Sequence, residues 1–253
     1  MVPTIDKTVA PGKAASTWTG PAREQAVQRM FTAIARFYDL NNSLLSFGLH
    51  HSWKHTAVSY IPNTPGTRTL DLGAGTCDLA ILVDQHLQFT SQIIAADLNL
   101  AMLRMGQKKV RSQKLAKRIT CLQMNAERLT FPQGTFDTVT AGFCIRNVGN
   151  LPQALSEICR VLQPGGRFVC LEFSRPVSAS LRKIYDWYSF HLLPWIGTKV
   201  ARDGTGVYEY LPASIRSFPD QERLGELLRE AGFQTVDYHN LTGGIVAIHV
   251  AVK

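Results

Sequence analysis

Between residues 68 and 173, short apolar segments alternate with segments in which apolar residues recur at helical spacing. Two neighbouring strands that run in the same direction need a connection that crosses the sheet, and a helix usually supplies it. The pattern therefore predicts an α/β fold with a mostly parallel sheet and helices on both of its faces. The expected strands are 68–72, 92–97, 119–124, 135–142 and 167–173, and the expected helices are 79–86, 100–111 and 151–162.

Both ends of the chain depart from this alternation. A helix over 220–231, ended by Gly232, precedes two apolar segments, 233–241 and 245–250, and the turn between them predicts an antiparallel hairpin. Before residue 68, helical spacing predicts helices over 24–39 and 44–60, whereas residues 1–20 have no periodicity and are expected to be a flexible leader. We therefore expect a single domain over 21–253, with an N-terminal helical cap at about 21–62 and a lid insertion at about 176–217.

Composition narrows the class of protein. A hydrophobic content of 45% in 253 residues is sufficient for a sizeable core. The five cysteines show no C-x-x-C spacing, so we expect free thiols and no metal site. No apolar run is long enough for a membrane-spanning helix, and no secretion signal is evident, so a cytoplasmic location is expected. The net charge of +8 is compatible with nucleic acid or an anionic membrane surface and decides between neither.

The loop after the first predicted strand, 70–78 (LDLGAGTCD), predicts a cofactor site. Gly73 and Gly75 let the backbone turn tightly at the carboxyl edge of the sheet, where nucleotide-type cofactors bind. A dinucleotide fingerprint requires a third glycine at position 78, but this chain has Asp78. A carboxylate there repels a pyrophosphate and favours a cationic ligand, so we predict that the cofactor is S-adenosylmethionine.

Two further strand ends agree with this prediction. Asp97, about 20 residues beyond the loop, can accept hydrogen bonds from ribose hydroxyls. Asn125 follows the third strand, where it can contact the adenine; taken singly, a turn-forming Asp97 and a capping Asn125 remain open alternatives. The predicted cofactor-binding residues are Asp71, Gly73, Gly75, Thr76, Asp97, Leu98, Asn125, Ala126 and Gly142.

A series of motifs outside the cofactor loop resembles the UbiE-type ubiquinone/menaquinone biosynthesis C-methyltransferases. The resemblance extends from about residue 31 to residue 253, and its motifs are 38–42 (YDLNN), 46–48 (SFG), 125–127 (NAE), 143–148 (FCIRNV), 171–174 (LEFS), 185–197 (YDWYSFHLLPWIG), 214–216 (SIR) and 218–221 (FPDQ). It implies a Rossmann-like class I methyltransferase fold with seven strands and an antiparallel C-terminal hairpin. It also implies methylation of a ring carbon of a polyprenylated quinol, with S-adenosylmethionine as donor.

Three residues are candidates for this chemistry. A ring carbon becomes nucleophilic when the neighbouring hydroxyl loses its proton, so Arg146 is expected to stabilise the phenolate, and Asn147 to orient the hydroxyl or a water. Tyr38 is a third candidate for the hydroxyl relay. The residues alone also allow a structural role for each: Arg146 could form a surface salt bridge, and Tyr38 could be an aromatic residue of the core. Asp39 either pairs locally with Arg36 or has another role.

The aromatic segment 185–197 has basic flanks and suggests a packed lid or pocket wall for a prenyl tail, with peripheral membrane contact at the inner face of the cytoplasmic membrane as a compatible alternative. The basic run between Lys108 and Arg118 is expected to be a solvated helical face. A homodimer is a further open alternative.

The sequence allows two rival functions. A nucleic-acid methyltransferase with Cys144 as nucleophile is disfavoured by the neighbours of Cys144, so no nucleic-acid partner is expected; an inactive scaffold would be expected to lack Asp97 or the loop glycines. Two departures from the family's pattern concern the cofactor. Cys77 stands where glycine is frequent, and is expected to place a side chain near the cofactor, and Gly142 stands where serine is frequent.

Overall fold

The sheet has seven strands in the order β3-β2-β1-β4-β5-β7-β6, and only β7 runs antiparallel to its neighbours. The computed structural model describes residues 20–87, 91–192 and 205–253. The expected mostly parallel sheet with a terminal hairpin is confirmed. The strands are β1 (Arg68–Leu72), β2 (Gln92–Asp97), β3 (Ile119–Gln123), β4 (Phe136–Gly142), β5 (Leu162–Phe173), β6 (Thr235–Leu241) and β7 (Val246–Val252).

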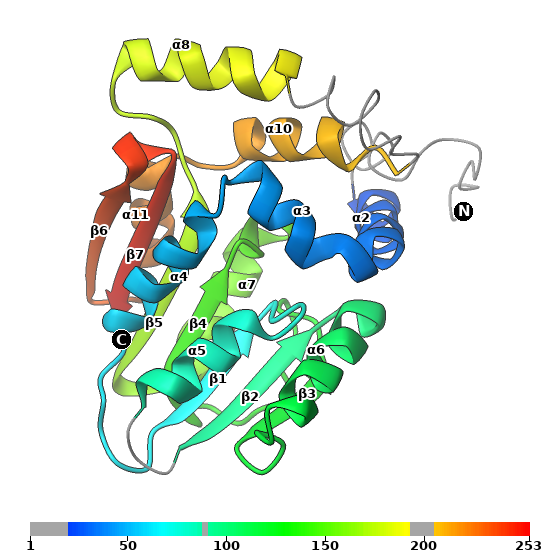
Figure 1. The fold of residues 1–253 in the computed structure, drawn as a ribbon. Coiled ribbons are helices and arrows are strands. Elements are labelled where there is room, and N and C mark those ends of the chain that lie inside the picture. Colours follow the sequence, from blue (N-terminus) through cyan, green and yellow to red (C-terminus); the bar gives the residue numbers. More distant parts are fainter. Residues whose placement is uncertain (1–19, 88–90, 193–204) are drawn as a thin grey trace.

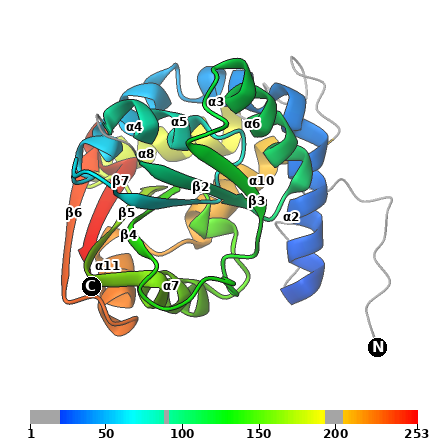
Figure 2. The same cartoon turned by 90° about the horizontal axis from the view of Figure 1, so that it is seen from below.

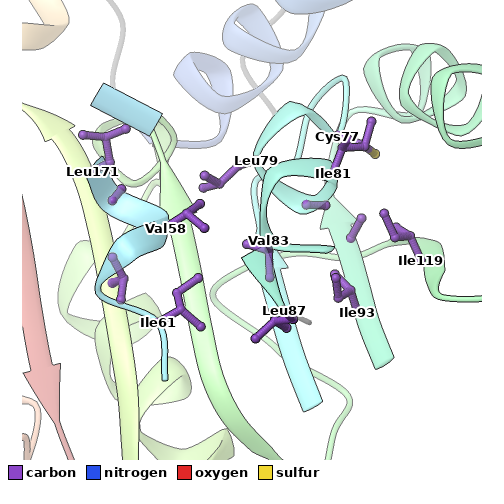
Figure 3. Close-up of a cluster of buried hydrophobic side chains, with 14 of the residues drawn as sticks. Val58, Ile61, Cys77, Leu79, Ile81, Val83, Leu87, Ile93, Ile119 and Leu171 are labelled. Carbon is purple, nitrogen blue, oxygen red and sulfur yellow. The ribbon is translucent and has the colours of Figure 1, made fainter. Parts of the chain in front are cut away.

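Helices cover both faces of the sheet, as predicted (Figure 2). On one face lie α4 (Leu49–Ser59), α5 (Asp78–His86) and α6 (Leu100–Ser112), and on the other lie α7 (Leu151–Val161) and α11 (Gln221–Glu230). Each face has its own buried apolar cluster. In the first cluster, Val58 and Ile61 meet Leu79 and Val83 of α5 above the strands (Figure 3). Burial of these side chains on both faces holds the strand ends in a fixed arrangement.

The N-terminal region differs from the sequence prediction. The first predicted helix begins earlier and is divided into α2 (Gly20–Ile34), a 3-10 turn η1 (Ala35–Phe37) and α3 (Tyr38–Leu45). The second is interrupted because Phe47 and Gly48 have positive φ, of 50° and 76°, and this ends α3 and starts α4. The placement of α4 in the cap was also wrong. Trp53, Ala57 and Val58 of α4 are buried in the core, so α4 is part of a main layer.

The remaining elements lie beyond the carboxyl ends of the parallel strands (Figure 1). They are α3 from the cap, and α8 (Ala179–Trp187), a π-helical turn η3 (Tyr188–Leu192) and α10 (Val207–Ser217) from the predicted lid. The leader at 1–19 and lid residues 193–204 lie outside the described residues. In the part of the chain that the structure describes, no helix is both long and apolar enough to cross a membrane.

Candidate active site

The turn from β1 into α5 forms the loop that the sequence analysis singled out. Gly73 and Gly75 have φ of +67° and +53°. A Cβ atom at Gly73 would lie 2.3 Å from the Cβ of Cys144, so the loop packs against the end of β4 only because residue 73 has no side chain. This close packing leaves the main chain of the loop facing the carboxyl edge of the sheet.

The expectation for Cys77 was wrong. Its side chain is fully buried, and its Sγ lies 3.8 Å from the Sγ of Cys121 on β3. It also fills the space beside Gly106 of α6, where a Cβ would lie 2.4 Å from the Cys77 Sγ. Because the positive φ of Cys77, 64°, turns this side chain into the core, it does not narrow the approach of the cofactor.

A cavity of about 100 Å³ lies at this edge of the sheet. Six predicted cofactor residues line it: Gly73, Gly75, Asp97, Leu98, Asn125 and Ala126. The three others, Asp71, Thr76 and Gly142, line a smaller adjoining cavity together with Gly73 and Gly75. The structure therefore brings all nine residues together around one loop, although they come from four strand ends.

Backbone donors fix the carboxylate of Asp97. Its Oδ2 accepts a hydrogen bond from the Gly75 N–H at 2.8 Å, and its Oδ1 accepts one from the Asn99 N–H at 2.6 Å. Burial raises the pKa of Asp97, and these two donors oppose that rise. Each oxygen keeps further acceptor capacity, which suits two neighbouring ribose hydroxyls.

The Asn125 side chain caps its own turn, because its Oδ1 accepts a hydrogen bond from the Glu127 N–H at 2.8 Å. The capping role that was left open is therefore present. Asn125 nevertheless lines the cofactor cavity, so it shapes the floor of that cavity whether or not its amide contacts the adenine.

Asp71 is a buried carboxylate beneath the loop. Its Oδ1 accepts a hydrogen bond from the Thr140 hydroxyl at 2.8 Å, whereas its Oδ2 is buried without a partner among the described residues. Burial raises the pKa of Asp71 to about 7, with opposition from the Thr140 hydrogen bond. An unpaired buried carboxylate oxygen is costly, and a cationic ligand at the adjoining cavity would offset that cost.

In the folded chain, Asp78 does not select the cofactor in the predicted way. Asp78 accepts a hydrogen bond from Lys54 at 2.9 Å and another from Lys109. Although burial raises the pKa of Asp78, these two ammonium groups outweigh it and lower the pKa. The carboxylate is therefore compensated, so it does not repel a phosphate in the way that the sequence analysis assumed.

Lys109 also joins the cap to the cofactor loop. Its Nζ donates to Oδ2 of Asp39 on α3 at 2.7 Å, and Asp39 Oδ1 accepts from the Thr76 hydroxyl at 2.6 Å. Asp39 is therefore part of a cap-to-loop contact and is not paired with Arg36. The prediction that Lys109 belongs to a solvated face was wrong, because tertiary contact brings two carboxylates, Asp39 and Asp78, to its ammonium group.

A second and larger cavity, of about 380 Å³, lies between the cap, the lid and the end of the sheet. Its wall is mostly apolar and includes Met30, Ile34, Trp53, Phe173, Leu181 and Ile184. Tyr38 and Phe143 line both this cavity and the cofactor cavity, so the two spaces meet at these side chains. The arrangement places an apolar substrate cavity directly beside the predicted cofactor.

Arg146 is buried and not on the surface. Its Nη1 donates to Oε1 of Glu172 at 2.6 Å and to the Phe143 carbonyl at 2.7 Å, and its guanidinium lies over the Phe173 ring. Burial by itself lowers the pKa of Arg146, but Glu172 outweighs this and raises it. Its Nε is buried without a partner in the described part of the chain. Arg146 lines the large cavity as a permanent cation.

The other two catalytic candidates flank this cation. Asn147 lines the cofactor cavity, and its Oδ1 accepts a hydrogen bond from the hydroxyl of Tyr210 on α10 at 2.6 Å. Tyr38 is half-buried, and removal of its hydroxyl from water raises the pKa of that hydroxyl. It contacts Phe31 edge to face, as a core aromatic would, yet it also stands between the two cavities.

Sequence reasoning missed several residues of this site. Glu172 lay inside a quoted motif, but only the β4–β5 pairing brings it to Arg146. Tyr210 and His50 were not assigned because no local pattern marks them, and Phe143 lay inside the motif 143–148 without a role of its own. Cys144 is only partly buried and lines the cofactor cavity, but its Sγ donates to the Leu72 carbonyl at 3.1 Å, and removal from water raises the pKa of the thiol well above the ordinary value, which makes it a poor nucleophile. Among the described residues, no group of three potential metal ligands was found.

Solved structures similar to this chain share its fold. The [4+2]-cyclase SpnF matches with a TM-score of 0.67 and 17% identity, over 91% of this chain and 96% of that one. The phosphoethanolamine N-methyltransferase 2 of Haemonchus contortus, solved in complex with S-adenosyl-L-methionine, matches with a TM-score of 0.58 and 19% identity, over 79% and 52%. Together with the two cavities, these matches define the Rossmann-like fold of S-adenosylmethionine-dependent methyltransferases.

Sequence comparison is more specific. The profile of the ubiE/COQ5 methyltransferase family matches residues 20–253, and the chain belongs to that family. The ubiquinone/menaquinone biosynthesis C-methyltransferase UbiE of Vibrio vulnificus (strain YJ016) is 44% identical over 93% of this chain and 92% of its own length. UbiE of Legionella pneumophila (strain Corby) is 43% identical over 91% and 92%. The cofactor predicted from the sequence, S-adenosylmethionine, is therefore confirmed, although the reason drawn from Asp78 was wrong.

We predict that Asp97→Asn weakens binding of S-adenosylmethionine by about 10- to 100-fold, measured by calorimetry on the purified chain. An amide at this position presents only one acceptor oxygen and places an N–H₂ group against a backbone donor. Asp84→Asn is the matched control, because Asp84 is also buried and hydrogen-bonded but lies in the Arg118 ion pair away from both cavities. Equal losses of affinity in the two variants would contradict the assignment of Asp97.

Proposed function

We propose that this chain transfers a methyl group from S-adenosylmethionine to a ring carbon of a polyprenylated quinol, in menaquinone or ubiquinone biosynthesis. One observation carries the proposal: the consecutive residues Arg146 and Asn147 line different cavities, the large apolar one and the cofactor one. A single turn of chain, η2 (Ile145–Asn147), therefore spans the boundary across which a methyl group would pass. The names of the curated relatives support the same reaction.

The cofactor supplies a methyl group on a cationic sulfur, and the residues around the loop fit such a ligand. Asp97 offers two oriented carboxylate oxygens for the ribose, and the buried carboxyl of Asp71 lies at the adjoining cavity, where its charge would favour a cationic group. Burial raises the pKa of both carboxyls, and in its charged form each would repel a pyrophosphate placed against it. The chain thus holds the donor by carboxylates and by main-chain groups.

Arg146 has the properties that carbon methylation requires. A hydroxyl that loses its proton places negative charge on oxygen and pushes electron density onto the neighbouring ring carbon. A buried guanidinium stabilises that charge more strongly than an exposed one, and Glu172 keeps it in place without consuming all its donors. Tyr38, where the cavities meet, is placed to relay the hydroxyl proton, and Asn147 is held by Tyr210 to orient a water or hydroxyl.

The wall of the large cavity suits a prenyl tail. Five residues both line the cavity and are exposed, so they mark its mouth. Four of them are large apolar groups, Phe47 at 79% exposure, Ile184 at 65%, Trp187 at 60% and Leu49 at 43%, and the fifth is Thr242. Phe37, Leu40 and Leu44 extend this exposed apolar surface along the cap. Such a rim supports docking at a membrane surface, from which a prenylated substrate would enter.

The direct test is methyl transfer by the purified chain with methyl-labelled donor. We expect label in demethylmenaquinol, in the demethylated ubiquinol precursor or in both, and none in bulk transfer RNA. Both quinols and the RNA are offered at equal concentration under reducing conditions. Label in RNA and in neither quinol would refute the proposed function.

Within that assay, we expect Arg146→Lys to lower kcat by at least about 100-fold while leaving the affinity for the methyl donor within about twofold. Lysine keeps the charge but lacks the planar fork that reaches both Glu172 and the substrate. Arg216→Lys is the control, since Arg216 also pairs with a carboxylate, Asp186, and lies over an aromatic ring, but lines neither of the two cavities. A parallel loss of donor affinity and kcat would assign Arg146 to cofactor binding.

For the membrane surface, we expect the double variant Phe47→Ser/Trp187→Ser to reduce sedimentation with phosphatidylcholine–phosphatidylglycerol vesicles by about tenfold or more, because two large apolar groups no longer enter the interface. Leu100→Ser/Tyr238→Ser is the control: both residues are exposed, at 41% and 38%, and neither lines the large cavity. Equal vesicle binding by the wild type and the first variant would refute this part of the proposal.

A further inference from the structure

His50 is a buried histidine that the proposed chemistry does not use. It is the second residue of α4, its exposure is 4%, and it lines the large cavity. Burial, with help from the positive charge of Lys54, lowers the pKa of His50 to about 4. At neutral pH the imidazole is therefore uncharged, and one of its two nitrogens carries a lone pair.

Ser46 determines which of the two imidazole nitrogens of His50 carries the lone pair. The Ser46 hydroxyl lies 2.6 Å from the carbonyl oxygen of Asn42, and two oxygens come this close only when a proton lies between them. Ser46 thus donates its one hydrogen to Asn42 and can only accept from His50, whose Nδ1 lies 2.9 Å from the Ser46 Oγ. His50 must therefore carry its proton on Nδ1.

The other nitrogen, Nε2, is left with a lone pair. No described residue forms a hydrogen bond with Nε2. This nitrogen is not fully buried, and His50 lines the large cavity, so a ligand in that cavity can reach it. Other polar groups on the wall, such as the hydroxyl of Tyr38 and the amides of Asn41 and Asn42, are able both to donate and to accept. His50 Nε2 differs from them because it can only accept.

We propose that His50 is a specificity-determining residue: its Nε2 accepts a hydrogen bond from a hydroxyl of the reduced quinol and so selects the quinol over the oxidised quinone. This inference rests on the proposed function. A quinol carries hydroxyl donors, whereas a quinone presents only carbonyl acceptors and would leave Nε2 facing another lone pair. Arg146 on the same wall offers only donors, which suits the oxygen that becomes a phenolate.

Selection of the quinol over the quinone is useful to a methyltransferase of this kind. Only the reduced ring can supply electrons to the methyl group, so a bound quinone would block the cavity without reacting. The Arg146 guanidinium can only donate hydrogen bonds, and His50 Nε2 can only accept one. Together they match a quinol that has lost the proton of one hydroxyl and kept the proton of the other. The quinol and the quinone differ little in size, so shape discriminates between them only weakly. A hydrogen bond to Nε2 that the quinone cannot form discriminates more strongly.

The test is equilibrium dialysis, without oxygen, of the full chain in complex with S-adenosylhomocysteine, which cannot transfer a methyl group. The probes are a 1,4-naphthoquinol that carries one prenyl unit beside an unsubstituted ring carbon, kept reduced by dithionite, and the corresponding quinone. We expect the wild type to bind the quinol about tenfold more tightly than the quinone. In His50→Phe, which keeps a ring of similar size, the two affinities should become nearly equal.

Ser46→Ala tests the same inference without removing the imidazole. Once Nδ1 loses its acceptor, the proton can move to Nε2, which then donates, so the preference should fall or reverse toward the quinone. His51→Phe is the matched control: the ring of His51 contacts that of His50, with centroids 3.9 Å apart and planes tilted by 38°, but His51 does not line the cavity. The quinol preference of this variant should equal that of the wild type.

The outcomes separate the two proposals. A wild type that binds both probes equally, or a His50→Phe or Ser46→Ala variant that keeps the full preference, would overturn the role of His50 and leave the proposed function standing. A wild type that binds neither probe would refute the proposed function, and the inference with it. A variant whose kcat falls while its quinol-to-quinone ratio is unchanged would also overturn the inference, because His50 would then act on the proton and not on selection.

Discussion

The buried ion pair between Arg146 and Glu172 is the constraint on which the rest of the site depends. Glu172, the last residue but one of β5, is 1% exposed, so an uncompensated charge there would be strongly destabilising. The pairing of β4 with β5 sets Gly142 opposite Leu171 and thereby brings the two charges together. Because Arg146 also donates to the Phe143 carbonyl, the turn after β4 is fixed, and Asn147 is directed to the neighbouring cavity.

A second polar network ties the cap to the cofactor loop. Lys109 of α6 bridges Asp39 of the cap and Asp78 at the start of α5, and Thr76 closes the connection with Asp39. These groups are only partly exposed, so the contacts between them are less screened than at the surface. The wall of the substrate cavity is therefore held in a fixed position relative to the site of the methyl donor. Tyr38, next to Asp39, lies where the two cavities meet.

The fold alone leaves the reaction open. A [4+2]-cyclase is among the solved structures that share it, with a TM-score of 0.67. What distinguishes this chain is the combination of a cavity with apolar walls and a buried cation, together with a family match over residues 20–253. A site of this kind can be identified only after the elements beyond the strand ends have been placed over the sheet.

The sequence by itself determined the parallel sheet, the terminal hairpin and the glycine loop, because periodicity and positive-φ requirements are local properties. It also placed Asp97 and Arg146 at the carboxyl ends of β2 and β4, which the strand order sets on either side of β1 and its glycine loop. Only the tertiary structure decided how side chains were used: Cys77 turns into the core, Asp78 is neutralised by two lysines, and His50 presents Nε2 because Ser46 is committed to Asn42. Such outcomes depend on partners distant in the sequence or on hydrogen-bond geometry, and no local pattern encodes them.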